Sequence, residues 1–211
     1  MNSRKDCMAD ANPIPVQFKG QRDYLQGADL HDALCALVEA NGYANIEKID
    51  LTFHKIVREG VDARISDRVP ASAAPGDTVA VFHFRANGND KAIFLIPNGQ
   101  PVTVRIPYPE EQIVAACEFN RERQSMSVPG SLPFSNMEIL VAANKALLQR
   151  LFPDEPGKWI FTRLQLTEGI WHRRFETLEV RLEANLNFLL TRSAITAGNM
   201  ALGRIFFSLV K

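Results

Sequence analysis

The segment from Asn136 to Phe152 has the sequence NMEILVAANKALLQRLF, and its apolar residues do not keep to one side. At helical spacing they spread around most of the circumference of the predicted helix. A helix of this kind is buried on more than one face, because a single covered stripe would leave leucine and valine side chains in water. We therefore expect a sheet that curls around this helix.

The residues that follow supply such a sheet. Pro153 to Gly157 are typical of a helix end, and runs with strand periodicity come next, with no helical pattern between them. Parallel strands need a crossover, usually a helix, so this order predicts an antiparallel sheet in an α+β protein. The predicted strands are Trp159 to Leu166, Thr177 to Asn185, Asn187 to Ala197 and Leu202 to Val210.

The first half of the chain repeats this order. A helix is predicted from Ala28 to Asn41, ended by Asn41-Gly42. Strand patterns follow it, with turns predicted at Asn87-Gly88-Asn89 and Asn98-Gly99. The predicted strands are Ile49 to Phe53, Thr78 to Arg85, Ala92 to Pro97 and Val102 to Ile106.

These patterns predict two units, residues 1–110 and 111–211, with residues 1–12 as a disordered lead-in. Each unit would have one long helix followed by about four strands. When the two halves are aligned through their helices, Thr78 to Val81 faces Thr177 to Val180. An internal duplication explains the match, and a chance order of elements is the alternative.

The composition narrows the classes of function. The chain has 211 residues, 46% of them hydrophobic, and its 24 basic and 24 acidic side chains give no net charge. A surface that reads nucleic acid needs a basic excess, and no run approaches the roughly 18 apolar residues of a membrane span. Three scattered cysteines and four scattered histidines indicate a reduced, cytoplasmic location, and their spacing predicts no metal site.

Residues 18–33, FKGQRDYLQGADLHDA, resemble the hot-dog fold dehydratases that act on β-hydroxyacyl-ACP. Phe18 and Gly20 match the family's His-Phe-Pro-Gly motif, Gly27 matches its helix-start glycine, and Asp32 falls where the family has a carboxylate. The resemblance implies two fused hot-dog units, each an antiparallel sheet wrapped around one long helix. Three other segments are similar to family turns: Pro75 to Thr78, Asn98 to Val102 and Val128 to Gly130.

The resemblance also implies a substrate. Members act on acyl chains carried as thioesters on the phosphopantetheine of ACP or CoA, with no further cofactor, at the seam between two hot dogs. Acyl-ACP, acyl-CoA and an acyl carrier protein are therefore the expected partners, and association into a homo-oligomer stays open. In the family a histidine removes the α-proton, a helix carboxylate handles the leaving hydroxyl, and helix-start amides polarise the carbonyl.

This sequence keeps only part of that machinery. Gln17 and Ser127 stand at the two histidine positions, and Val141 stands at the carboxylate position of the second helix. Paired crosswise at a seam, one site would hold Gln17 with Val141, and the other would hold Ser127 with Asp32. Neither pair is a histidine and a carboxylate, so the usual catalytic histidine is expected to be absent.

The candidate site residues follow from the resemblance and from their residue types. The catalytic candidates are Asp32, Tyr24 and Glu138, and the substrate-binding candidates are Gln17, Gly27, Ala28, Asn136 and Arg22. Plain structural roles compete with these: a solvated Asp32, a packed Tyr24, a salt bridge at Arg22 and an N-cap at Asn136.

Three hypotheses follow. The first is an enzyme acting on acyl thioesters, as a lyase of the dehydratase type, a thioesterase or an acyl transferase. The second is a non-catalytic protein that binds an acyl chain or serves as a scaffold in a fatty-acid or polyketide-type biosynthetic complex. The third is an unrelated α+β dimerisation domain.

Overall fold

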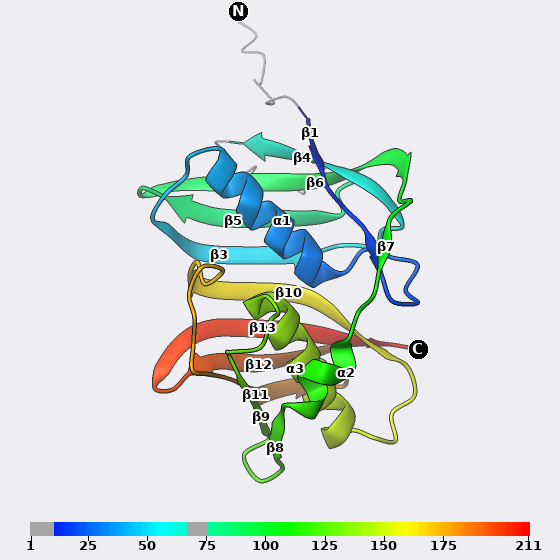
Figure 1. Cartoon of the computed structure of the whole chain (residues 1–211), viewed down its shortest axis with the longest axis vertical. Helices are drawn as coiled ribbons and strands as arrows, with labels where there is room; N and C mark the ends of the chain where they lie inside the picture. The colour runs from blue at the N-terminus through cyan, green and yellow to red at the C-terminus, as the bar shows by residue number, and fades with distance from the viewer. Residues whose placement is uncertain (1–10, 67–75) are drawn as a thin grey trace, which may run out of the picture.

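The computed structural model describes residues 11–66 and 76–211, and it has two long helices on one face of a large sheet (Figure 1). Helix α1 (Gly27–Ala40) and helix α3 (Asn136–Leu151) confirm both predicted helices. No helix in these two ranges is long and apolar enough to cross a membrane. Most of the predicted lead-in lies outside the described residues, but Asn12 begins a strand, so the lead-in was placed too far along the chain.

The sheet has eleven strands, and every neighbouring pair in it is antiparallel, as the sequence predicts. From one edge to the other the strands are β1 (Asn12–Ile14), β4 (Glu59–Ser66), β6 (Asn89–Pro101), β5 (Ala80–Ala86), β3 (Ile46–Phe53), β10 (Lys158–Glu168), β13 (Met200–Val210), β12 (Leu190–Ala197), β11 (Thr177–Leu186), β9 (Ser125–Pro129) and β8 (Glu118–Asn120). A separate parallel pair joins β2 (Phe18–Lys19) to β7 (Arg105–Ile106), and α2 (Glu110–Ala115) is a short helix.

The strand predictions of the first half were partly wrong. The hairpin at Asn87-Gly88 is confirmed, with both residues at positive φ. The predicted turn at Asn98-Gly99 does not form, because β6 continues to Pro101 and pairs with β4, a strand that the sequence patterns missed. The Asn98 side chain accepts a hydrogen bond from the Gln100 amide at 3.1 Å. Between the pairs Val61–Pro97 and Glu59–Pro101, residues 98–100 of β6 lie opposite Gly60 alone, so β6 bulges here without ending. Pro75 of the predicted Pro75 to Thr78 turn lies outside the described residues.

The two halves differ in strand order. Counting outward from the centre of the sheet, the strands after α1 run β3, β5, β6, β4, whereas those after α3 run β10, β13, β12, β11. Strands β4 and β5 point the same way because β6 lies antiparallel between them. Thr78 to Val81 leads into β5, next to the central β3, whereas Thr177 begins β11 on the far side of β12. The alignment of these two segments was therefore wrong.

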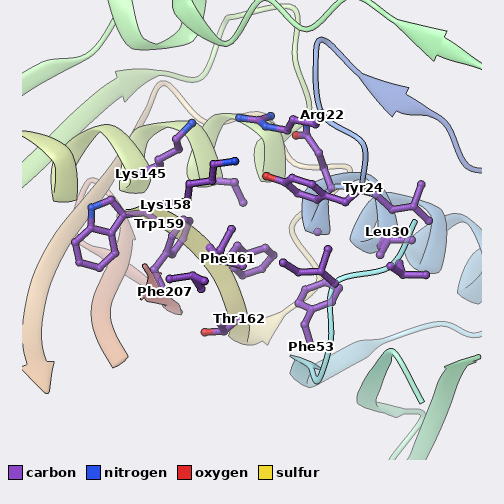
Figure 2. Close-up of a pocket in the computed structure, with 18 of the residues that line it drawn as sticks. Arg22, Tyr24, Leu30, Phe53, Lys145, Lys158, Trp159, Phe161, Thr162 and Phe207 are labelled. Atoms are coloured by element: carbon purple, nitrogen blue, oxygen red, sulfur yellow. The ribbon is translucent and has the colours of Figure 1, made fainter. Parts of the chain in front are cut away.

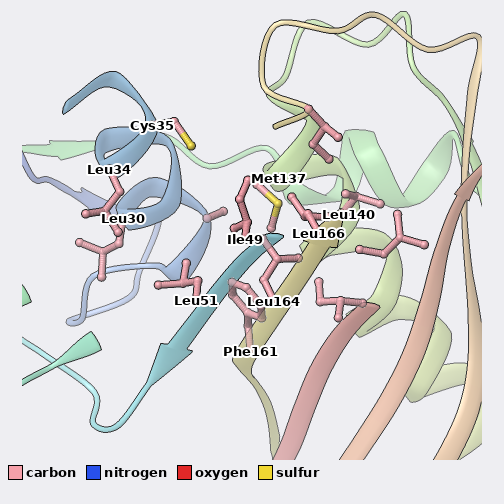
Figure 3. Close-up of a cluster of buried hydrophobic side chains, with 14 of the residues drawn as sticks. Leu30, Leu34, Cys35, Ile49, Leu51, Met137, Leu140, Phe161, Leu164 and Leu166 are labelled. Atoms are coloured by element: carbon pink, nitrogen blue, oxygen red, sulfur yellow. The ribbon is translucent and has the colours of Figure 1, made fainter. Parts of the chain in front are cut away.

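One hydrophobic core runs through both halves. Leu30 and Leu34 of α1 lie on one side of this core and Leu140 of α3 on the other, with Ile49 and Met137 between them (Figure 3). Helix α3 is buried on more than one face, as its sequence predicts. Its buried apolar residues are Met137, Ile139, Leu140, Ala142, Ala143, Ala146, Leu147 and Leu148.

The halves are joined where β3 pairs with β10. Asp50 of β3 accepts hydrogen bonds from Arg163 of β10, at Nε (2.8 Å) and at Nη2, and a third from Gln165 at 3.0 Å. Burial of the Asp50 carboxyl favours its neutral form, but the bonds from Arg163 and Gln165 outweigh this and lower its pKa. A charged carboxylate therefore ties the two central strands together.

The lowered pKa of Asp50 makes the strength of this tie depend on pH. The stabilisation is fully present above the ordinary aspartate pKa of 3.8 and is lost as the pH falls through the lower folded value. Arg163 is partly exposed, so we expect Asp50→Asn to lower the free energy of unfolding by about 1 kcal/mol at neutral pH. This difference should vanish in acid. Urea unfolding across a pH series measures it, with the exposed Asp154→Asn as control. A difference that stays constant with pH would contradict the ionic role.

Candidate active site

A cavity of about 550 Å³ lies at the seam between the halves (Figure 2). Its walls come from the start of α1 and the end of β3 in the first half, and from β10 and α3 in the second. Leu30, Phe53, Val141, Phe161 and Phe207 make much of the lining apolar. The size and the apolar lining are typical of a small-molecule site.

The start of helix α1 opens on this cavity. Gln26 and Gly27 line the cavity, and the Gln26 side chain makes no capping hydrogen bond. The first amides of a helix have no partner within the helix and carry the positive end of its dipole. They can therefore bind a negative or partly negative oxygen, such as a thioester carbonyl.

Gly27 allows the two halves to meet closely. A Cβ atom at this position would lie 2.5 Å from Cδ1 of Phe161 and 3.1 Å from Cε2 of Phe53. The two rings stack edge to face, with their centroids 5.3 Å apart. An aromatic side chain from the second half therefore lies directly against the helix start of the first.

The start of helix α3 is closed by its own neighbours. Ser135 is the N-cap, not Asn136: its hydroxyl accepts from the Glu138 amide at 3.1 Å, and its own amide donates to Glu138 Oε2 at 3.0 Å. The Asn136 amide group donates to the carbonyls of Ile170 (2.6 Å) and Arg173 (3.0 Å). The cavity lining includes Gly27 and does not include Asn136.

The cavity brings together three of the predicted site residues, Arg22, Tyr24 and Gly27. Arg22 donates to Glu110 Oε2 at 2.6 Å, and its guanidinium lies 4.9 Å from the centroid of the Tyr108 ring. Val141 also lines this cavity, but Gln17, its partner in the predicted crosswise pairing, is not part of the lining.

Glu138 lies outside the lining of this cavity, in an ionic cluster between the two helix starts. Lys19 Nζ is 2.5 Å from Asp29 Oδ1 and 2.6 Å from Glu138 Oε1. Burial raises the pKa of Asp29, while its contact with Lys19 opposes the rise. Glu138 binds Lys19 and also takes part in the cap of α3. Its role is therefore structural, because it helps to hold the starts of α1 and α3 together.

Asp32 also lies outside the lining. Its Oδ1 is 2.9 Å from Nδ1 of His31, a fully buried ring that contacts Phe82 and Trp171 edge to face. The indole N–H of Trp171 in turn donates a hydrogen bond to the Glu39 carboxylate. Ala28 is buried in the core, and Ser127 pairs with Glu179 in the sheet.

Several cavity residues were missed by sequence reasoning. They are His54, Glu110, Lys145, Lys158 and Phe161. Lys145 carried a usable signal, because it is a lone charge in the apolar stretch of α3. His54, Lys158 and Phe161 become neighbours through the pairing of β3 with β10, and Glu110 through its contacts with Arg22 and Lys145. In the part of the chain that the structure describes, no group of three His, Cys, Asp or Glu residues is placed to hold a metal ion.

The close approach at Gly27 can be tested by substitution. In an ordinary helix Gly→Ala gains up to about 1 kcal/mol, but here we expect Gly27→Ala to lose about 1–3 kcal/mol because the methyl group displaces Phe161. Phe161→Leu should reduce this loss in a double-mutant cycle followed by thermal unfolding. Gly76→Ala is the control, because among residues 11–66 and 76–211 no atom beyond its chain neighbours lies within 4 Å of its Cβ position. A stabilising Gly27→Ala would contradict the packing.

Comparison with known proteins places the fold. No family model matches the sequence, and no curated protein does. Among solved structures, the pyran synthase domain from module nine of the sorangicin pathway has a TM-score of 0.51 at 12% identity, covering 99% of this chain and all of its own. The tesB protein of Mycobacterium avium subs paratuberculosis has a TM-score of 0.50 at 13% identity, covering 94% and 92%. At these identities the likeness shows the fold alone: the chain is a hot-dog fold protein.

Proposed function

We propose that this chain binds acyl thioesters in the seam cavity and hydrolyses them. The observation that carries the proposal is the uncapped start of α1, which opens on an apolar cavity large enough for an acyl chain. The thioester carbonyl would accept from the amide of Gly27, and the chain would lie along Phe53, Phe161 and Phe207.

The placement of the carboxylates favours hydrolysis over dehydration. A dehydratase needs an acid beside the β-hydroxyl, yet Asp32 is engaged with His31 and Glu138 with Lys19 and Ser135, both outside the cavity lining. Hydrolysis needs a water that attacks the carbonyl carbon and a thiol that leaves. Tyr24 and His54 line the cavity and can exchange protons with these groups.

Two fused hot-dog units, residues 1–110 and 111–211, are part of this proposal. One long helix precedes the four longest strands of each half, and the cavity takes its walls from both halves. The different strand orders count against a plain duplication, so the proposal rests on the seam and not on the repeat. The acyl carrier and the cytoplasmic location stay predictions.

A panel of acyl-CoA and acyl-pantetheine thioesters of increasing chain length tests the activity, with release of free thiol and product mass as readouts. We expect turnover that Tyr24→Phe lowers by about tenfold or more, if its hydroxyl supplies a proton or a hydrogen bond to the reacting thioester. Tyr43→Phe is the control, because Tyr43 packs on Phe84 and is not part of the cavity lining.

A non-catalytic acyl-binding protein is the second candidate. Two observations favour this candidate. Gln17 stands at the family's histidine position, and the carboxylates of Asp32 and Glu138 are already bound to other side chains. Saturable binding of the same thioesters with no release of thiol would support this candidate and overturn hydrolysis. The absence of both binding and product would overturn the two together.

A further inference from the structure

The two sides of the seam cavity differ in charge. Arg22, Lys145 and Lys158 place their nitrogen atoms along one side, whereas Phe53, Phe161 and Phe207 lie on the other (Figure 2). The cations come from three different elements: the loop before α1, helix α3 and strand β10. The cavity is therefore amphipathic across its width.

Only part of this positive charge is neutralised. Glu110 serves both Arg22, at 2.6 Å, and Lys145, at 3.1 Å. Lys158 forms no ion pair with any carboxylate among residues 11–66 and 76–211. The exposed Lys55, another lining residue, likewise has no ion pair within these ranges. The other carboxylate of the lining, Asp23, is exposed, pairs with Arg58 and also interacts electrostatically with Lys158. The lining therefore holds four cations, on Arg22, Lys55, Lys145 and Lys158, against the two carboxylates of Glu110 and Asp23.

We propose that the ligand of this cavity carries an anionic group, a phosphate or a carboxylate, which Lys158 binds beside Arg22 and Lys145. This deepens the proposed function and rests on it. An ammonium group binds either anion as a compact point charge, and the aromatic wall opposite takes the apolar chain. Lys158 is exposed at the cavity mouth, and the excess of cations over carboxylates in the lining gives the site a preference for negative amphiphiles.

The anionic group has two sources that share this chemistry. It can be the phosphate of the phosphopantetheine carrier, or a carboxylate at the far end of the acyl chain. An acyl-CoA, the same acyl-pantetheine without phosphate, and a carboxyacyl-pantetheine separate them. If only the acyl-CoA binds tightly, the anionic group is the carrier phosphate. If only the carboxyacyl-pantetheine binds tightly, the anionic group is the carboxylate of the acyl chain.

Simple amphiphiles test the charge preference without any thioester. Titration calorimetry with the full chain would compare dodecyl phosphate and dodecanoate with dodecanol and dodecyltrimethylammonium, all below their micelle concentrations. We expect the two anions to bind about tenfold more tightly than the alcohol, and the cation to bind most weakly. Lys158→Gln should remove most of this difference and leave the affinity for dodecanol unchanged.

Lys48→Gln is the matched control, because Lys48 is an exposed lysine of β3 outside the cavity lining. Equal binding of anion and alcohol, or an anion preference that Lys158→Gln leaves intact, would overturn the charge inference while the apolar cavity stands. Failure of every amphiphile to bind would overturn the cavity's role and the proposed function with it.

Discussion

The pairing of β3 with β10 is the contact on which the site depends. It turns two smaller sheets into one, and the Asp50–Arg163 bonds reinforce it. The same pairing brings Phe161 of β10 against Gly27 at the start of α1. Without it the helix start would face water, and the apolar wall opposite would be missing. Burial alone favours joining the sheets, because an open β3 or β10 edge would expose unpaired backbone groups.

The two helix starts have taken different roles. At the start of α3, Ser135 and Glu138 each accept a hydrogen bond from the backbone amide of the other. The side-chain amide of Asn136 donates to the carbonyls of Ile170 and Arg173. At α1 the Gln26 side chain makes no capping bond. Lys19 links the two regions by binding Asp29 of one helix and Glu138 of the other. This difference supports the proposal that a ligand binds at the start of α1, while the start of α3 has a structural role.

Local patterns predicted the elements better than their arrangement. Both long helices and the Asn87-Gly88 hairpin follow from periodicity and turn residues, which are short-range signals. The insertion of β6 between β4 and β5 is a long-range choice, and no local pattern in the sequence encodes it. The site divides in the same way. Tyr24 and Gly27 belong to a local motif, whereas Lys158 and Phe161 join them only through the register of β10 against β3.

The strand order also bears on how the chain reaches its native state. Strands β11, β12 and β13 form a meander of neighbouring hairpins, so their contacts are local and close quickly. Arg163 and Asp50, in contrast, are separated by 113 positions along the chain. Closing so long a loop is entropically costly before any pairing offsets it, so the joining of β3 to β10 is expected late in folding. The seam cavity would then be the last part of the molecule to take shape, after each half has acquired its own hydrophobic nucleus.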